Sequence, residues 1–438
     1  VVIGGLVSAT LLTLLVLPAL YVLFFGKRKR RGLPKTAALF VGLFLLKTAG
    51  VFAQNKTVTL AECLALASQN NLYLKGAALE TAQNRALEGT AKDLGKSNFS
   101  LTQDPTSGGN IDNSLGISQS FALPKTYAAR RAALQQQTAV SEKALAVSQN
   151  DLAREVRLAY FSLVFLNEKM RLLGRQDSLY RDFAARAELR NKTGETNFLE
   201  VLAARNRSQQ TLLLLKQAQS DAAVWQIELQ RLTASAEILT PSDPALAKLP
   251  APLDPTAAQN PLLDFYRQKT SLAAAETEVV RRENAPEFSA GYFQQLVLPW
   301  YSDARPYSKW GVGGIQFGAS VPLFNGKAFR ARMQASQIGA QVAQNRLAAA
   351  QNDLQSRIGQ AFAETRKWQD ALDFYEKTGL QQADEILRIA QTAYSRGEIG
   401  YIEFIQNTAQ ALDTRLGYLD ALHRFDQSVI EINHLKGQ

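Results

Sequence analysis

Residues 112–130, DNSLGISQSFALPKTYAAR, contain the junction that decides the fold. Up to Leu123, larger side chains alternate with small polar ones, which predicts a β-strand with two unlike faces. One face carries Asn113, Leu115, Ile117, Gln119, Phe121 and Leu123, and the other carries Asp112, Ser114, Gly116, Ser118, Ser120 and Ala122. From Lys125 the next 116 residues contain no proline. We therefore expect the strand to lead into long helices, because proline interrupts a helix interior.

A second proline-free block of the same length, residues 323–438, follows later in the chain. Between the two blocks, six prolines fall within residues 241–261. Because a proline inside a helix costs roughly 3 kcal/mol, the two blocks predict paired helical regions and the proline-rich segment predicts a linker. The sequence therefore divides into a first repeat, 54–240, a linker, 241–261, and a second repeat, 262–438.

Short matches between the two blocks support a duplication with a period of about 200 residues. SFALP at 120–124 corresponds to SVPL at 320–323, and KTGE at 192–195 corresponds to SRGE at 395–398 with an offset of 203. Asn70-Asn71-Leu72 lies ahead of the first block, and Asn260-Pro261-Leu262 lies ahead of the second. We interpret the chain as two copies of one plan.

Both blocks have the apolar spacing of a coiled coil. Steps of three and four residues separate Leu152, Val156, Ala159, Leu163, Leu166, Met170 and Leu173 in the first, and Ile402, Ile405, Ala409, Leu412, Leu416 and Leu419 in the second. A period of 3.5 residues predicts left-handed coiled-coil packing. A helix from Lys125 to Arg190 would be about 100 Å long at roughly 1.5 Å per residue, a length suited to spanning a distance.

A second alternating stretch precedes the second block. Ile315, Phe317, Ala319 and Val321 oppose Gln316, Gly318 and Ser320, and residues 98–103 and 287–298 are expected to be the partner strands. Two hairpins with one apolar and one small, polar face are typical of a membrane β-barrel. Because the smallest such barrels need about eight strands, four strands predict closure by several copies of the chain.

Aromatic residues flank the loop of the second hairpin and fit a girdle at a membrane interface. The alternative is a soluble two-hairpin sheet with these aromatic residues at the edge of its core. The predicted girdle consists of Trp300, Tyr301, Tyr307 and Trp310.

The positive charge of the chain is concentrated near its N-terminus. There are 49 Lys and Arg against 39 Asp and Glu, a net charge of +10. Residues 1–61 hold eight basic residues and no acidic one, which leaves +2 for residues 62–438. The basic character therefore describes one segment, and we expect no nucleic-acid partner.

Residues that commonly carry chemistry are scarce. Cys63 is the sole cysteine of the sequence, which excludes an intrachain disulfide, and its spacing from Leu60 and Ala67 predicts a small buried hydrophobe. His423 and His434 lack the i, i+4 spacing of a helical metal pair. Because we find no phosphate-binding loop, Ser/His/Asp set or paired carboxylates, we predict no enzyme, no cofactor and no metal site.

The first 53 residues predict two membrane-directed segments. Residues 1–26 contain a 25-residue apolar run that is long enough to cross a bilayer, and the KRKRR motif that follows predicts a cytoplasmic end. Within residues 27–53, a basic flank, an apolar stretch at 36–46 and small residues before Ala53 predict a signal peptide cleaved after Ala53. The alternative is an uncut anchor. Residues 1–50 are thus expected to associate with the inner membrane before any cleavage.

The opening run, VVIGGLVSATLLTLLVLPALY, resembles the end of the last transmembrane helix of resistance-nodulation-division pumps, in wording closest to their heavy-metal branch. The chain begins with Val and has no Met before Met170, so we expect a piece of a longer polypeptide. The resemblance implies an inner-membrane pump, fused upstream of this chain, that exports heavy-metal cations.

Residues 57–435 resemble the TolC-like outer-membrane efflux protein family. The motifs are Thr59-Leu60-Ala61-Glu62 with Leu66-Ala67 and Asn70-Asn71, the proline-bounded strand-to-helix junctions, and the Gly-Glu turns before heptad helices. This resemblance implies a mainly α-helical homotrimer with a 12-stranded barrel in outer-membrane lipid and a helical barrel through the periplasm. Such a protein is a passive exit duct that receives cargo from a proton-driven pump through a periplasmic adaptor.

The resemblance also implies roles for the two turns that join the long helices. The turns would form the periplasmic tip, where the adaptor docks, at Gly194, Glu195, Gly397 and Glu398. A glycine at such a position also supplies a positive φ between antiparallel helices, whatever docks there.

One helical turn further along lie two equivalent acids, Glu200 and Glu403. In a trimer each becomes a ring of three negative charges across a narrow pore, although a carboxylate on a long helix is usually just solvated. Some family members carry a further Asp where this chain has Gln406, so a weaker charge gate is implied. Tyr394 and Arg396 would hold the tip shut, or form an ordinary exposed helix end.

For the function of the whole chain, two rival classes of protein remain. One is a periplasmic adaptor, and the other is a structural coiled-coil protein without a pore.

Overall fold

The computed structural model describes residues 55–438 apart from 107–109, 253, 255–259 and 298–311. The predicted pump-like segment 1–26, the segment 27–53 with its cleavage site, and the aromatic residues Trp300, Tyr301, Tyr307 and Trp310 lie outside the described residues. Residues Asn55–Gln438 form one compact unit. Within the described part of the chain, no helix combines the length and the apolar character needed to cross a membrane.

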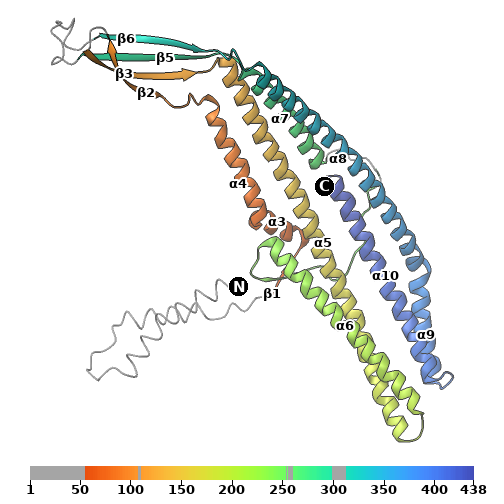
Figure 1. The fold of residues 1–438 in the computed structure, drawn as a ribbon. Helices are drawn as coiled ribbons and strands as arrows, with labels where there is room; N and C mark the ends of the chain where they lie inside the picture. Colours follow the sequence, from red (N-terminus) through yellow and green to blue (C-terminus); the bar gives the residue numbers. More distant parts are fainter. Residues whose placement is uncertain (1–54, 107–109, 253, 255–259, 298–311) are drawn as a thin grey trace, which may run out of the picture. The chain divides into compact units, whose positions relative to one another are not determined.

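Helices dominate this unit (Figure 1). Two short helices and a 3₁₀ turn precede the first hairpin, and two long helices follow it. In the second half a single helix precedes the hairpin, and the first of the two helical runs that follow contains a π-helical turn. The helical elements are α3 (Leu60–Asn70), α4 (Leu72–Leu87), η1 (Glu88–Lys92), α5 (Pro124–Lys192), α6 (Phe198–Thr233), α7 (Pro261–Arg282), α8 (Gly326–Phe374), η2 (Tyr375–Gly379), α9 (Leu380–Ser395) and α10 (Tyr401–Leu435).

The long helices correspond between the two repeats. α5 has 69 residues and contains the helix predicted from Lys125 to Arg190, which is thereby confirmed. Its counterpart is the unbroken helical run α8–η2–α9. The returning helices α6 and α10 have 36 and 35 residues. Proline occupies the first turn of α5, where its missing N–H leaves no hydrogen bond unmade.

The two predicted hairpins are confirmed and join into one antiparallel sheet of order β2-β3-β5-β6. Its strands are β2 (Asn98–Thr106), β3 (Asn110–Phe121), β5 (Glu287–Val297) and β6 (Val312–Ser320). A second, parallel pair, β1 (Asn55–Val58) with β4 (Ile238–Pro241), was not predicted from the sequence.

The register of the sheet places apolar residues of all four strands on one face. Ile117 lies opposite both Phe99 of β2 and Tyr292 of β5, and Tyr292 lies opposite Ile315 of β6. These side chains are open to solvent in the isolated chain, with Phe99 76% and Ile315 72% exposed. The other face carries mostly serine, glycine and glutamine, so the predicted two-faced strands are confirmed.

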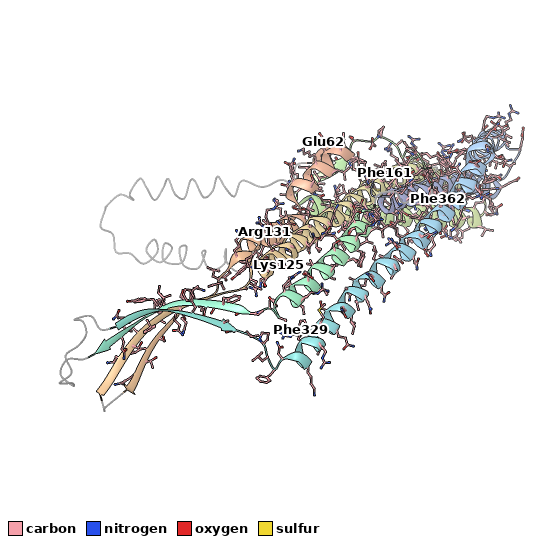
Figure 2. All side chains as sticks on the ribbon, turned by 90° about the horizontal axis from the view of Figure 1, so that it is seen from above. Glu62, Lys125, Arg131, Phe161, Phe329 and Phe362 are labelled. Atoms are coloured by element: carbon pink, nitrogen blue, oxygen red, sulfur yellow. The ribbon has the colours of Figure 1, made fainter. Side chains whose placement is uncertain are left out.

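The sheet lies at one end of the unit and the two helix turns lie at the other (Figure 1). Next to the sheet, α4, α5, α7 and α8 run side by side, and further along α5 is flanked by α6 and α10. In Figure 2, Lys125 and Phe329 mark the sheet-proximal ends of α5 and α8, whereas Phe161 and Phe362 lie further along the same helices.

The predicted heptad positions of α5, and those in the second half of α10, contribute to the main core. Val156, Ala159 and Leu173 on α5 are completely buried, and Leu419 and Leu422 of α10 belong to the same cluster. Cys63 is also completely buried, and burial raises the pKa of its thiol to about 11, so the prediction of a small buried hydrophobe is confirmed.

The predicted stripe on α10 is wrong at its first position. Ile402 is 38% exposed, while its neighbours Tyr401 and Phe404 are buried. The reason is that the first turn of α10 packs against an aromatic residue of α5, Phe183, and rings fill that space better than an isoleucine.

Each repeat also has a buried asparagine that ties two helix ends together. The side-chain amide of Asn71 donates to the carbonyl of Leu232 at the end of α6 (2.9 Å), and its oxygen caps the start of α4. The amide of Asn260 donates to the carbonyl of Leu435 at the end of α10 (2.7 Å), and its oxygen caps α7. The sequence match therefore points to a repeated joint but is shifted by one residue, because it aligned Asn70 with Asn260, whereas the structure makes Asn71 the equivalent of Asn260.

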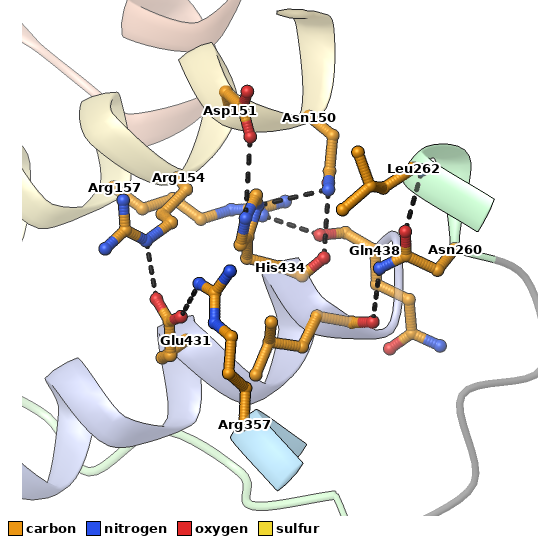
Figure 3. A network of polar contacts seen from close by, with 11 residues as sticks. Asn150, Asp151, Arg154, Arg157, Asn260, Leu262, Arg357, Glu431, His434 and Gln438 are labelled. Carbon is orange, nitrogen blue, oxygen red and sulfur yellow. Dashed lines mark hydrogen bonds and ion pairs between the residues drawn. The ribbon is translucent and has the colours of Figure 1, made fainter. Parts of the chain in front are cut away.

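Near the second of these joints, a polar network connects three helices (Figure 3). Glu431 of α10 accepts from Arg154 of α5 (2.6 Å) and from Arg357 of α8 (2.9 Å). Burial alone would raise the pKa of Glu431, but the two guanidinium groups hold it below its usual value. His434 contacts Asn150 (3.0 Å) and Asp151 (3.5 Å), and burial lowers its pKa.

Candidate functional site at the helix turns

The two turns that join the long helices have the same backbone geometry. The N–H of Glu195 donates to the carbonyl of Arg190 (2.8 Å), and the N–H of Glu398 donates to that of Ala393 (2.9 Å). The glycine before each acid, Gly194 or Gly397, donates to the carbonyl three residues earlier (3.1 Å in both). This is the Schellman arrangement, which satisfies the last carbonyls of a helix.

Both turns require glycine because of their backbone angles. Gly194 has φ +78° and Gly397 has φ +74°, in the left-handed region that side chains disfavour. A Cβ atom added to either residue would meet no atom within 4 Å in the described structure. Space therefore remains around both turns, and the local requirement for glycine is conformational.

The acids beside the glycines are exposed and weakly paired. Glu195 lies 3.7 Å from Arg190, and Glu398 lies 3.7 Å from Arg396. Ion pairs on such open surfaces contribute at most about 1 kcal/mol. The carboxylates are therefore accessible to a partner in both turns.

The predicted aperture acids occupy the same position in their helices. Glu200 is the third residue of α6 and Glu403 is the third residue of α10. A negative charge there interacts favourably with the helix N-terminus, which gives both acids a local structural role. Glu200 is half-buried and accepts from Thr196, whereas Glu403 is exposed.

The helix starts differ in their capping. The side chain of Asn197 accepts from the backbone N–H of Glu200 (3.0 Å), and Asn191 donates to the carbonyl of Thr196 (2.9 Å). At the second turn the capping residue is Gly400, which has no side chain to accept from α10. The first turn is thus fixed by side chains, and the second depends on the packing behind it.

That packing is a cluster of four rings. The ring of Tyr394 stacks on Phe404 (centroids 4.8 Å apart), and Phe183 of the first repeat meets Phe404 edge-on (4.8 Å). Tyr401 completes the cluster, and burial raises the pKa of its phenol above the usual value. Tyr394 is therefore half-buried between two helical hairpins, α5–α6 of the first repeat and α9–α10 of the second.

The remaining predicted residues of this region lie on the surface. Arg396 and Gln406 are exposed, on the second turn and on α10. Sequence reasoning missed Phe183, although it lies in the same three- and four-residue spacing that continues from Leu173 through Tyr180 to Ala187. It also missed Arg207, which links α6 to Asp413 of α10 (3.9 Å).

Metal-binding groups are not found at the turns. In the described ranges, no three His, Cys, Asp or Glu residues are grouped so as to hold a metal ion. What the turns offer is two exposed Gly-Glu surfaces on rigid helix ends, suited to contact with another protein.

Comparisons with known proteins give the fold and a family match for the second half of the chain. Residues 253–438 match the family model of the outer membrane efflux protein. Comparison with curated proteins gives no match. Among solved structures, CusC is 20% identical with a TM-score of 0.71, over 88% of this chain and 95% of CusC.

Two further outer-membrane proteins have similar folds. The Campylobacter jejuni CmeC channel is 16% identical with a TM-score of 0.74, over 89% of this chain and 90% of CmeC. Vibrio cholerae VceC is 16% identical with a TM-score of 0.71, over 86% of this chain and 96% of VceC. Residues 253–438 therefore match the model of the outer membrane efflux protein family, and the described chain has the fold of these solved structures.

Proposed function

We propose that the chain forms a trimeric outer-membrane channel that serves as the passive exit duct of an efflux system. The observation that carries this proposal is the sheet, whose apolar face is exposed on all four strands. The strands have 9, 12, 11 and 9 residues, close to the roughly 9–11 residues with which a tilted strand spans a bilayer. The apolar face would contact lipid and the polar face would line water.

Closure of the barrel follows from the two ends of the sheet. Among the described strands, β2 and β6 each pair on one side only. All neighbouring strands are antiparallel, so β6 of one copy placed beside β2 of the next continues the antiparallel order. Three copies then supply twelve strands, in agreement with the family resemblance.

The mass of the protein in detergent tests this proposal. Light scattering corrected for bound detergent is expected to give three protomer masses. A monomer that stays soluble without detergent would favour the rival classes, a periplasmic adaptor or a structural coiled-coil protein.

A matched pair of substitutions tests the lipid face. Ile315 lies on the apolar face and Gln316 on the other, at adjacent positions of β6. An arginine on the lipid face costs about 2–4 kcal/mol at the bilayer midplane. Ile315→Arg is therefore expected to abolish insertion into liposomes, whereas Gln316→Arg inserts normally and changes ion selectivity. Equal insertion of both variants would contradict the assignment of faces.

The helices would extend from the outer membrane through the periplasm. On this proposal the two turns form the tip, and Gly194, Glu195, Gly397 and Glu398 dock a periplasmic adaptor. The pump is an inner-membrane, proton-driven protein of the resistance-nodulation-division type. The resemblance of residues 1–25 to its heavy-metal branch supports heavy-metal cations as cargo, and export assays with and without the pump test this assignment.

The aperture would lie just inside the tip. In a trimer, Glu200 and Glu403 each supply three carboxylates that favour cations, with Gln406 as a neutral ring beside them. Tyr394 and Arg396 belong to the closed tip, through the ring cluster and the surface pair with Glu398. Glu403→Gln is expected to lower cation selectivity in planar bilayers more than Glu398→Gln does, because the latter acid lies outside the aperture.

A further inference from the structure

The second repeat contains a π-helical turn that the first repeat lacks. In η2 the N–H of Leu380 donates to the carbonyl of Tyr375, five residues earlier. The equivalent stretch of the first repeat lies inside α5, which is continuous. The run from Gly326 to Ser395 is one residue longer than α5, and a π-turn takes up one extra residue.

The π-turn packs against α10 through a ring and through its buried Gly379, where an added Cβ would lie 3.5 Å from Cγ2 of Thr414. Tyr375 lies across Gly417, where an added Cβ would be 2.4 Å from its Oη and 3.0 Å from its Cζ. Tyr418 of α10 packs edge-on against the same ring (6.4 Å). Because a π-turn has looser backbone bonding than an α-helix, the helix can bend here if nothing else restrains it.

A segment of the inter-repeat linker supplies such a restraint. We call residues Asp243–Leu249 the strap. The hydroxyl of Tyr160 on α5 donates to Asp243 (2.7 Å), and the N–H of Leu246 donates to Glu168 on α5 (2.8 Å). Leu246 is buried. The strap is therefore anchored on the first repeat.

The end of the strap contacts the second repeat. The N–H of Leu249 donates to Asp426 of α10 (2.9 Å), a completely buried carboxylate. Between these anchors, Lys248 lies 3.6 Å from Glu376 in η2 and 5.3 Å from the ring centre of Phe425 on α10.

The charges around Lys248 explain why this residue matters. Asp426 and Glu376 are acidic, and so is Glu168 on α5. Burial raises the pKa of Tyr418, and the negative charges of these three acids raise it further, so all three lie near this tyrosine. The other oxygen of Asp426 has no hydrogen-bond partner among the described residues. A cation beside these acids compensates their repulsion, and a charge-assisted hydrogen bond to a buried carboxylate is stronger than a neutral one.

We propose that the strap locks the π-turn and thereby restrains the α9–α10 hairpin that carries Gly397, while the α5–α6 hairpin stays fixed. Releasing Lys248 frees η2 to bend and lets the second turn move away from the first. The consequence for channel opening rests on the proposed function, but the lock itself is a property of the single chain.

Hydrogen exchange on the full chain in detergent tests the lock directly. Lys248→Glu replaces attraction to Glu376 by repulsion, and amides of 375–383 are expected to exchange at least tenfold faster. The matched control is Arg388→Glu, since this exposed arginine lies on α9 outside the measured amides and pairs with Glu385 of its own helix (2.9 Å). Amides of α5 near Tyr160 should be unchanged in both variants.

Planar-bilayer conductance then tests the consequence. Lys248→Glu channels are expected to conduct at least twofold more than the wild type, and Arg388→Glu channels the same as the wild type. Equal exchange in both variants would overturn the lock. If Lys248→Glu speeds exchange as expected but the protein shows no conductance at all, the result would instead count against the proposed function and would still support the lock. Should Lys248→Glu not assemble, Lys248→Gln serves, with an expected threefold increase in exchange.

Discussion

α5 and the run α8–η2–α9 leave the same sheet and end in the same kind of turn, but they are built differently in between. α5 is one continuous helix of 69 residues whose middle forms the main core. The second run contains a π-turn, an apposed ring and contacts to a strap from the linker. The two repeats thus share the sheet and the Gly-Glu turn at their ends, but the first has a continuous helix between them and the second has a helix interrupted by a π-turn.

Matched truncations of buried leucines should distinguish the two helical runs most strongly. Leu173 on α5 and Leu372 on α8 are both completely buried. Leu→Ala substitutions in cores cost about 2–5 kcal/mol, depending on how far the site can collapse. While the strap holds the π-turn, we expect both losses near the upper end of this range. In the Lys248→Glu background, where the π-turn can relax into the space, the loss for Leu372→Ala should fall toward the lower end, whereas the loss for Leu173→Ala should stay unchanged. Denaturant unfolding followed by circular dichroism measures these losses, and equal losses in that background would contradict a softer second helix.

The buried acid of the second repeat should give an unusual pH dependence. Burial raises the pKa of Asp426 to about 7, whereas the first repeat has Ala223 at the 203-residue offset. A raised pKa means that the folded state holds the proton more tightly. The favourable contribution is therefore present below pH 3.8, declines as the pH rises through 7, and is lost above it.

Asp426→Asn should remove that dependence. Roughly three pKa units correspond to an upper limit of about 4 kcal/mol, so the variant should exceed the wild type in stability by a few kcal/mol at pH 8 and by little at pH 4. His423, whose pKa burial lowers to about 4, acts with the opposite sign but is common to both proteins. Melting temperatures of the pair between pH 4 and 8 provide the measurement. A difference that does not grow with pH would refute this account of Asp426.

The paired asparagine joints should respond alike. Asn71→Ala and Asn260→Ala each remove a helix cap and leave a buried carbonyl, of Leu232 or Leu435, without its donor. The expected loss is about 1–3 kcal/mol for each variant. Similar losses in unfolding experiments would support equivalent joints, and a loss in only one variant would separate the repeats at this point as well.

The smallest effects are expected at the turns. Gly194→Ala and Gly397→Ala force a side chain into the left-handed region, at a cost of about 1–2 kcal/mol. The second substitution should disturb the local structure more, because Gly400 lacks the cap that Asn197 provides. Hydrogen exchange of the first turns of α6 and α10 would detect this, with Glu195→Ala and Glu398→Ala as controls that leave the backbone unstrained.

Local patterns made the main elements predictable. Proline-free blocks and alternating residues such as Leu115 and Ile117 predicted the helices and hairpins, because these patterns act within a few residues. The β1–β4 pair, the π-turn and the strap were not predictable, since they depend on partners far away in the sequence. At the helix turns, Glu200 and Glu403 were recognised as equivalent, but sequence alone could not reveal their shared place at a helix start or the ring cluster around Phe183.

The sheet also has a consequence for how the protein is made. β3 pairs with β5 over a long stretch of intervening chain, as in the register of Phe121 with Phe288. Contacts between such distant residues form slowly, so the helices between them can fold well before the sheet is complete. During that delay the edges of strands β2 and β6 have unpaired backbone N–H and C=O groups, which can pair with strands of other chains. The yield of folded protein should therefore fall as the chain concentration rises, and a cell that makes too much of this protein at once should accumulate aggregates.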